Sequence, residues 1–193
     1  TNSDKLGVAV AINAAGNRIA VGVPADDTPG ASSGSVYIVD YNETTGLWPD
    51  NGDGNGFINT APGRIKVSGG TTGMYMGGSL SFNAAGDILA IGAPALGGGT
   101  GTVFIIERDN TTGLWGRLDG FTGTNFTVNW EVYTTSYVLK AEGASTNLGR
   151  SVSLNAKGDR LAIGEYQINN QTGRVTLIHY DYQNKRWWTD GDN

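Results

Sequence analysis

Residues that could act as a nucleophile or a base are scarce in this chain. Its 193 residues include no cysteine and one histidine, His179, so disulfides, Cys-rich zinc sites and thiol catalysis are excluded. Ser32 lies in the pattern G-x-S-x-G at residues 30–34. A nucleophile elbow places such a serine between a strand and a helix, whereas the residues that follow here, 35–39, have the composition of a strand. We therefore expect no catalytic residue and no enzyme activity.

An oxygen-rich stretch at residues 50–55 is the candidate metal site. Asp50, Asp53 and Asn55 carry the oxygen ligands that calcium prefers. The stretch lacks the terminal bidentate glutamate of an EF-hand loop, and Phe57 stands where another carboxylate would help. A calcium site is therefore one hypothesis and a solvated turn is the other. We expect the fold to require no cofactor.

Three aromatic residues are candidates for ligand binding. Trp130, Tyr133 and Tyr137 lie in the longest connection between predicted strands, in a segment that has no counterpart elsewhere in the sequence. Exposed aromatic rings can stack on sugars, which would make the protein a lectin. The same side chains could instead cover the edge of a sheet, and both interpretations stay open at the level of sequence.

The glycosylation pattern N-x-[ST] occurs four times, at Asn42, Asn110, Asn125 and Asn170. Asn42 and Asn110 lie in matching turns that precede Trp48 and Trp115, and Asn170 lies in a predicted loop. Glycans require exposed loops of this kind. The four asparagines are therefore candidate modification sites, and the alternative is that they serve only as turn residues.

Composition excludes several classes of partner. The net charge is −5, from 18 acidic and 13 basic residues, and no basic cluster suits nucleic acid or an anionic membrane. No apolar run approaches the roughly 18 residues that span a bilayer. The 31 glycines are more than twice the usual share of about 7%. Together with many Val, Ile, Thr and Tyr residues, they predict short strands joined by tight turns.

A repeat organises most of the sequence. Three similar stretches begin at Leu6, Met76 and Leu148, and they read LGVAVAINAAGNRIAVGVP, MGGSLSFNAAGDILAIGAP and LGRSVSLNAKGDRLAIGEY. Apolar residues alternate on either side of an Asn-x-x-Gly turn, which predicts a β-hairpin in each stretch. We expect positive φ at the turn glycines, which are Gly16, Gly86 and Gly158.

Each hairpin is followed by a third predicted strand and then by a tryptophan. The third strands are expected at residues 34–39, 101–106 and 173–178, and the repeated tryptophans Trp48, Trp115 and Trp188 are expected to pack between units. Fourth strands are expected at residues 64–67 and 137–140, and residues 126–133 are a candidate for a further strand. The third unit ends before a fourth strand.

Four short antiparallel strands repeated at a fixed period are typical of β-propeller blades. We therefore predict an all-β fold with three blades of three to four antiparallel strands, at residues 1–70, 71–143 and 144–193, the last without its outer strand. A closed propeller typically needs four to eight blades. This chain alone is thus not expected to close the ring.

These stretches resemble the FG-GAP repeat of integrin α-chain-type propellers. The Phe-Gly of that motif appears here as Leu-Gly or Met-Gly, and the Gly-Ala-Pro is intact at residues 92–94. The resemblance implies a propeller with an extracellular or cell-surface role in adhesion. The family's calcium loop, D-x-[DN]-x-D-G, is replaced here by short Asn-x-x-Gly turns that are poor in carboxylates, so its calcium sites are not carried over.

The predicted function is that of a non-enzymatic extracellular repeat protein, used for adhesion or for structural assembly of a surface appendage or filament. The alternative is a carbohydrate-binding propeller lectin. Expected partners are further copies of the chain or the remainder of a longer chain, together with glycans or cell-surface proteins. The first and third units should each have one apolar face without a neighbouring blade.

Overall fold

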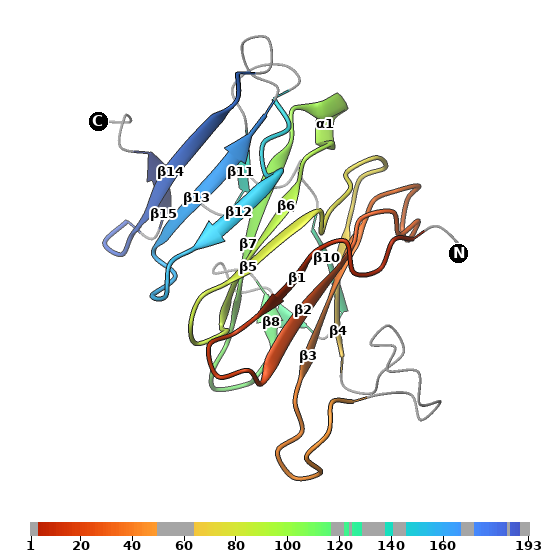
Figure 1. The fold of residues 1–193 in the computed structure, drawn as a ribbon, viewed down its shortest axis with the longest axis vertical. Helices are drawn as coiled ribbons and strands as arrows, with labels where there is room; N and C mark the ends of the chain where they lie inside the picture. The colour runs from red at the N-terminus through yellow and green to blue at the C-terminus, as the bar shows by residue number, and fades with distance from the viewer. Residues whose placement is uncertain are drawn as a thin grey trace.

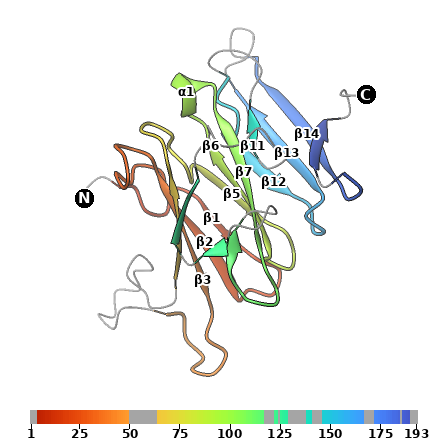
Figure 2. The ribbon, with the colours of Figure 1, turned by 180° about the vertical axis from the view of Figure 1, so that it is seen from behind.

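The computed structural model describes residues 4–49, 64–116, 122–123, 125–128, 138–140, 146–166, 172–184 and 186–189. These residues form three β-sheets that follow one another in chain order (Figure 1), an arrangement also visible from behind (Figure 2). The helix α1 (Leu96–Gly99) is the single helix within these ranges. None of the helical structure described is long and apolar enough to cross a membrane.

Each sheet is built from strands in sequence order, with additions at the outer edge. The first sheet has the order β1 (Val10–Ile12), β2 (Arg18–Val23), β3 (Ser35–Asp40), β4 (Ile65–Gly69) and β10 (Asn125–Val128). The second sheet contains β5 (Ser79–Phe82), β6 (Ile88–Ala93), β7 (Thr102–Arg108), β8 (Trp115–Gly116), β9 (Thr122–Gly123) and β11 (Val138–Lys140). The third sheet contains β12 (Ser151–Leu154), β13 (Arg160–Glu165), β14 (Arg174–Asp181) and β15 (Arg186–Thr189).

The hairpin between the first two strands of each sheet is held by one asparagine. Asn13 Oδ1 accepts hydrogen bonds of 3.0 Å from the backbone N–H groups of Asn17 and Arg18. Asn83 and Asn155 accept equivalent bonds in the second and third hairpins. The turn glycines have φ values of 71°, 75° and 81°, as predicted, at Gly16, Gly86 and Gly158. These turns are closed by the side-chain amide oxygen of the asparagine.

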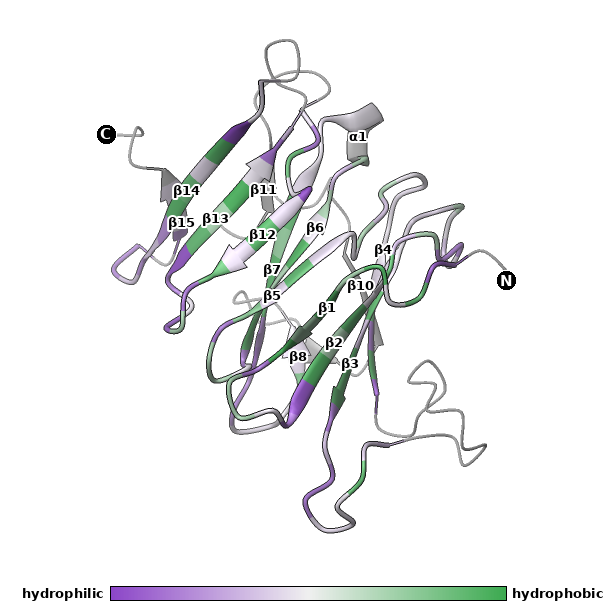
Figure 3. Cartoon of the chain, in the orientation of Figure 1, coloured by the Kyte–Doolittle hydropathy of each residue, from purple (hydrophilic) through white to green (hydrophobic). Residues whose placement is uncertain are grey.

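The core lies between neighbouring sheets, which pack face to face like propeller blades. The first cluster joins residues of the first sheet, such as Ala20 and Ile38, to residues of the second sheet, such as Ile91. The second cluster joins Ala90 and Ile105 of the second sheet to residues of the third sheet that include Leu161, Ile163 and Ile178. Apolar residues therefore run along the strands (Figure 3). The fold is all-β, with three propeller-type blades that these residues do not close into a ring.

The outer strands agree with the prediction in the first two units and differ in the third. β4 and β11 pair with β3 and β7 at the expected places. The third unit was predicted to lack its outer strand, but β15 pairs with β14 and contains both Trp187 and Trp188. The reason is a tight turn, in which Asp181 Oδ1 accepts hydrogen bonds from the N–H groups of Gln183 and Asn184. The chain therefore reverses immediately and needs no long connection.

The stretch predicted at residues 126–133 contributes a strand in an unexpected place. β10 pairs in parallel with β4, from Asn125 opposite Lys66 to Val128 opposite Gly69. A segment between the second and third hairpins thus extends the first sheet and covers the edge of β4. An edge strand otherwise leaves a row of unpaired backbone groups.

Candidate functional site

The loops that lead into the second and third hairpins each cross to the preceding sheet. Met76 N–H donates to the Ser33 carbonyl at 3.2 Å, and Leu148 N–H donates to the Thr100 carbonyl at 3.2 Å. Both side chains are buried in the cores between sheets. We call this apolar residue and the glycine after it the peg. Pegs are present at Leu6–Gly7, Met76–Gly77 and Leu148–Gly149.

The second and third pegs each enter a socket lined by glycines of the preceding sheet. A Cβ atom on Gly22 would lie 2.0 Å from the carbonyl oxygen of Gly77, and a Cβ on Gly92 would lie 2.0 Å from that of Gly149. Such distances exclude any side chain unless a sheet moves. In the second sheet, Ser79 Oγ also donates to the Gly149 carbonyl at 2.8 Å. Gly22 and Gly92, which begin the Gly-Val-Pro and Gly-Ala-Pro segments, are therefore required for the close contact between sheets.

The hairpin turns form a second line of contact. Ala14 N–H donates to the Ala84 carbonyl at 3.1 Å, and Ala84 N–H donates to the Ala156 carbonyl at 2.9 Å. The turns therefore form a ladder of hydrogen bonds along one end of the three sheets. Backbone groups make these bonds, so the ladder depends on turn geometry more than on side-chain identity.

The first residue of the second strand differs in side-chain type among the three sheets. Arg18 Nη1 donates to the Gly86 carbonyl at 2.8 Å, and its guanidinium lies over the Trp115 ring at 5.6 Å from the centroid. Ile88 takes this place in the second sheet, close to Gly158. Arg160 takes it in the third sheet, because the register pairs Arg18 with Asp40, Ile88 with Glu107 and Arg160 with His179.

The first sheet has an open apolar face. Val8, Val10 and Ile12 are 54%, 68% and 60% exposed. Residues at the positions of Val10 and Ile12 in the other two sheets pack against a preceding sheet. This is the face that the prediction expected to lack a neighbour, and we call it the N-terminal face.

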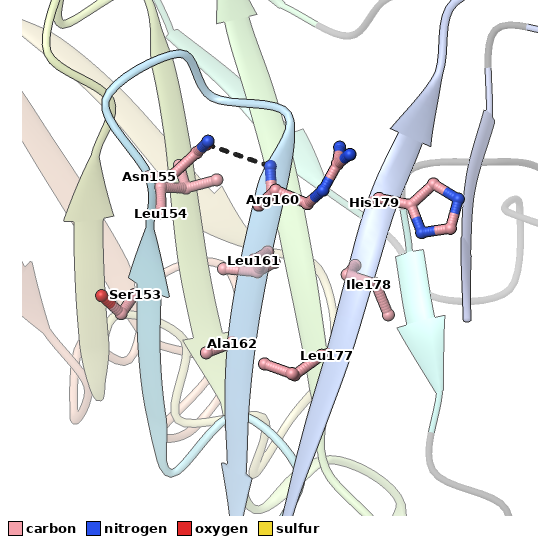
Figure 4. A pocket seen from close by; sticks show the side chains of 9 residues that line it. All are labelled: Ser153, Leu154, Asn155, Arg160, Leu161, Ala162, Leu177, Ile178 and His179. Carbon is pink, nitrogen blue, oxygen red and sulfur yellow. Dashed lines mark hydrogen bonds between the residues drawn. The ribbon is translucent and has the colours of Figure 1, made fainter. Parts of the chain in front are cut away.

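The third sheet has the complementary open face. Val175 and Leu177 are 67% and 63% exposed, whereas Val103 and Ile105, at the same positions of the second sheet, are 0% and 1% exposed. We call this the C-terminal face. Figure 4 shows a hollow on this face, of about 590 Å³, lined by side chains of β12, β13 and β14 and by Asn155. A second hollow of about 450 Å³ is lined by residues that include Ser151, Gly164 and Gly173.

Buried carboxylates serve as structural ion pairs. Asp26 accepts a 2.6 Å hydrogen bond from Ser35 Oγ and lies 2.7 Å from Lys66 Nζ. Burial opposes its ionisation, but the bonds from Lys66 and Ser35 hold the pKa of Asp26 below its usual value. In the third sheet, Glu165 accepts two 3.0 Å hydrogen bonds from Arg174.

Glu107 is a partly buried carboxyl whose titration is strongly displaced. Burial first, and then the nearby charge of Asp87, raise its pKa to about 7. Burial and the Glu107 charge also raise the pKa of Tyr180, on the facing third sheet. Glu107 therefore lies at the interface between the second and third sheets and carries a charge there only near or above neutral pH.

The catalytic pattern considered at Ser32 stays unsupported by the geometry. Ser32 lies in a loop of the first sheet and precedes strand β3, as predicted, while His179 is on β14 of the third sheet. The His179 ring packs edge-on against Trp188, with centroids 4.6 Å apart. No group of three His, Asp or Glu side chains within the described ranges is placed to hold a metal.

Several predicted site residues fall outside the described residues. These are Asp50, Asp53, Asn55, Trp130, Tyr133, Tyr137 and Asn170. Of the remaining glycosylation candidates, Asn42 and Asn110 are exposed in turns, and Asn125 begins strand β10. Asn42 Oδ1 accepts hydrogen bonds from the N–H groups of Thr44 and Thr45, and Asn110 Nδ2 donates to Asp87.

The repeated tryptophans are not equivalent. Trp115 is fully buried between the first two sheets, and Trp48 is partly exposed beside Tyr41. In the third sheet, Trp187 takes the buried position and Trp188 lies on the opposite face. The prediction chose Trp188, which is one residue too late. A one-residue shift along a strand moves a side chain to the other face of the sheet.

Sequence reasoning missed the role of the peg. In the sequence, Leu6, Met76 and Leu148 mark only the start of each unit, whereas in the structure the second and third of them join adjacent sheets. The available signal was an apolar residue before a glycine at the start of every unit, outside the alternating pattern of the hairpin.

Comparison with known proteins adds little to this picture. No protein-family model matches the chain, and no curated protein matches it either. Among solved structures, the periplasmic gluconolactonase PpgL of Pseudomonas aeruginosa aligns with 89% of the chain at 12% identity and a TM-score of 0.45. TolB of Acinetobacter baumannii aligns with 94% of it at 14% identity and a TM-score of 0.30.

The chain spans 39% and 42% of these two structures. Likenesses of this strength carry no argument about activity. The class of protein is defined by the molecule itself, through three antiparallel blades that pack face to face by means of repeated pegs and glycine sockets.

Proposed function

We propose that this chain is a non-enzymatic repeat protein that acts in adhesion or in structural assembly of a surface appendage or filament, through blade-to-blade and other protein contacts. One observation carries the proposal. The large exposed apolar residues Val10 and Ile12, and Val175 and Leu177, lie on the two end faces, at positions that are packed where a neighbouring sheet is present.

The energetics of these faces favour coverage by another protein. Burying a Val, Leu or Ile side chain contributes about 1.5–3 kcal/mol. Each end face therefore offers several kcal/mol on association, against the entropy lost when two molecules combine. Large exposed apolar patches on soluble proteins mark interaction sites.

The resemblance to FG-GAP repeats supports an extracellular or cell-surface location. Asn42 and Asn110 are exposed in turns, as glycan acceptors must be. The polar residues best suited to catalysis, Ser32 and His179, belong to different sheets, which supports a role without enzyme activity.

Sedimentation velocity and a glycan array together test this function. We expect the sedimentation coefficient to rise over a concentration range of roughly 1–100 µM, as for an interface of micromolar affinity. We also expect no glycan on the array to be bound. A monomer throughout this range would contradict the proposal, and a monomer that binds glycans would favour the lectin.

A further inference from the structure

We propose that the two end faces bind each other, so that the Leu6–Gly7 peg of one copy enters the open socket of the third sheet of a second copy. This inference rests on the proposed function and names its partner, which is a second copy of this chain in a head-to-tail arrangement.

The peg is already formed without a socket. Lys5 and Gly7 have φ values of 59° and 88°. The corresponding residues of the two engaged pegs have nearly the same values, which are 54° and 89° at Tyr75 and Gly77 and 53° and 83° at Asn147 and Gly149. Leu6 nevertheless remains exposed, and a Cβ on Gly7 would meet no atom within 4 Å. The first peg therefore has the conformation of the bound state but no preceding sheet to bind.

The socket is also formed without a peg. The smaller hollow of the third sheet is lined by Ser151, Gly164, Gly173 and Val175. These residues stand at the positions of Ser79, Gly92, Gly101 and Val103, which surround the Leu148–Gly149 peg in the second sheet. By this equivalence, Ser151 Oγ would donate to the Gly7 carbonyl of the second copy, as Ser79 does to Gly149.

Outside the socket, the C-terminal face carries the donor groups and the N-terminal face carries the acceptor groups of further polar contacts. The ladder of turns would continue through Ala156 N–H and the Ala14 carbonyl of the second copy, because Ala84 makes both kinds of contact inside the chain. Arg160 stands at the position of Arg18. It would therefore reach the hairpin turn of the second copy, as Arg18 reaches the Gly86 carbonyl.

The occupant is best matched by a second copy because this interface already occurs twice within the chain. The socket of this interface is repeated at the C-terminal face, and the peg is repeated at the N-terminal face. An interface between two different faces of one protein closes into a ring or grows into a filament. Two copies would supply six blades, which is within the usual range of four to eight.

Charged substitutions at the two faces test the arrangement. Leu6→Asp changes the peg and Leu177→Asp changes the C-terminal face, and both side chains are exposed, so both variants should fold. Leu47→Asp is the matched control for Leu177→Asp, since the two side chains are 66% and 63% exposed and Leu47 lies in the loop after β3, away from both pegs and sockets. We expect each face variant to weaken self-association at least about tenfold, and the control to associate like the wild type. Circular dichroism and thermal melting verify folding.

Mixing the two face variants distinguishes head-to-tail from symmetric pairing. A mixture retains one intact pair of faces, so we expect a one-to-one dimer that grows no further. If either variant alone still dimerises through its unchanged face, the head-to-tail inference is wrong while the proposed function stands. If the wild type itself stays monomeric, both are overturned.

Discussion

The middle sheet and the third sheet use the same residue positions in different surroundings. Val103 and Ile105 are buried against the third sheet, whereas Val175 and Leu177 at the same positions are exposed. Gly92 touches the next peg, whereas Gly164 meets only the Ser151 side chain of its own sheet. The difference teaches that the same apolar positions recur in both sheets, and that the presence of a neighbouring sheet decides whether they are buried.

The largest contrast is expected between two tryptophans. Trp115→Ala should lower the free energy of unfolding by about 3–5 kcal/mol, because it leaves a cavity in a closed core. Trp48→Ala should cost about 1 kcal/mol or less, because Trp48 is partly exposed and contacts Tyr41. Urea denaturation measures both. If both variants lost the same free energy of unfolding, Trp48 would have to be as closely packed as Trp115, which contradicts this comparison.

The two socket glycines should differ as well. Gly92→Ala should lower stability by about 2–3 kcal/mol, because its Cβ would overlap the Gly149 carbonyl. Gly164→Ala should cost less than about 1 kcal/mol, because the Ser151 side chain can move. Thermal melting of dilute samples tests this. If head-to-tail association occurs, Gly164→Ala should weaken it, which a sedimentation experiment detects.

The turn glycines offer a smaller contrast of the same kind. Gly16→Val forces a β-branched residue to positive φ, at about 1–2 kcal/mol. Gly86→Val should cost more, because its Cβ would also lie 2.7 Å from the Cβ of Asn13. An unchanged melting temperature for Gly86→Val would show that the contact between the two turns is dispensable.

The last contrast is a pH dependence at the interface between the second and third sheets. The pKa of Glu107 is raised in the folded protein from 4.5 to about 7, so the folded state binds this proton more tightly than the unfolded state does. The stability from this group is complete below pH 4.5 and is lost as the pH rises to about 7. Screening of the partly exposed carboxyl limits the loss to roughly 1–2 kcal/mol.

Denaturation of the wild type and of Glu107→Gln at several pH values isolates this contribution. The variant should lack the decline between pH 4.5 and 7. A decline of the same size in both proteins would assign it to other groups. The third sheet has His179 at the position of Glu107.

Much of the fold was predictable because its signals are local. The period-two alternation, the Asn-x-x-Gly turns and the positive φ of Gly16 depend on residues close in the chain. The tight turn at Asp181 escaped notice because it lacks the glycine of its counterparts, and β15 was missed with it. The placement of β10 beside β4 was not predictable, since parallel pairing between distant segments leaves no periodic mark.

The sequence by itself determined the number of units, their all-β character and the apolar faces that each unit presents. Only the tertiary structure decided that Met76 and Leu148 are pegs, that Gly22 and Gly92 lie against them, and that Trp187 is the buried residue of its pair. The physical reason is that alternation and turn chemistry act over a few neighbouring residues. Contact between sheets instead joins atoms about 70 positions apart in the chain, and it depends on close packing that no local pattern records.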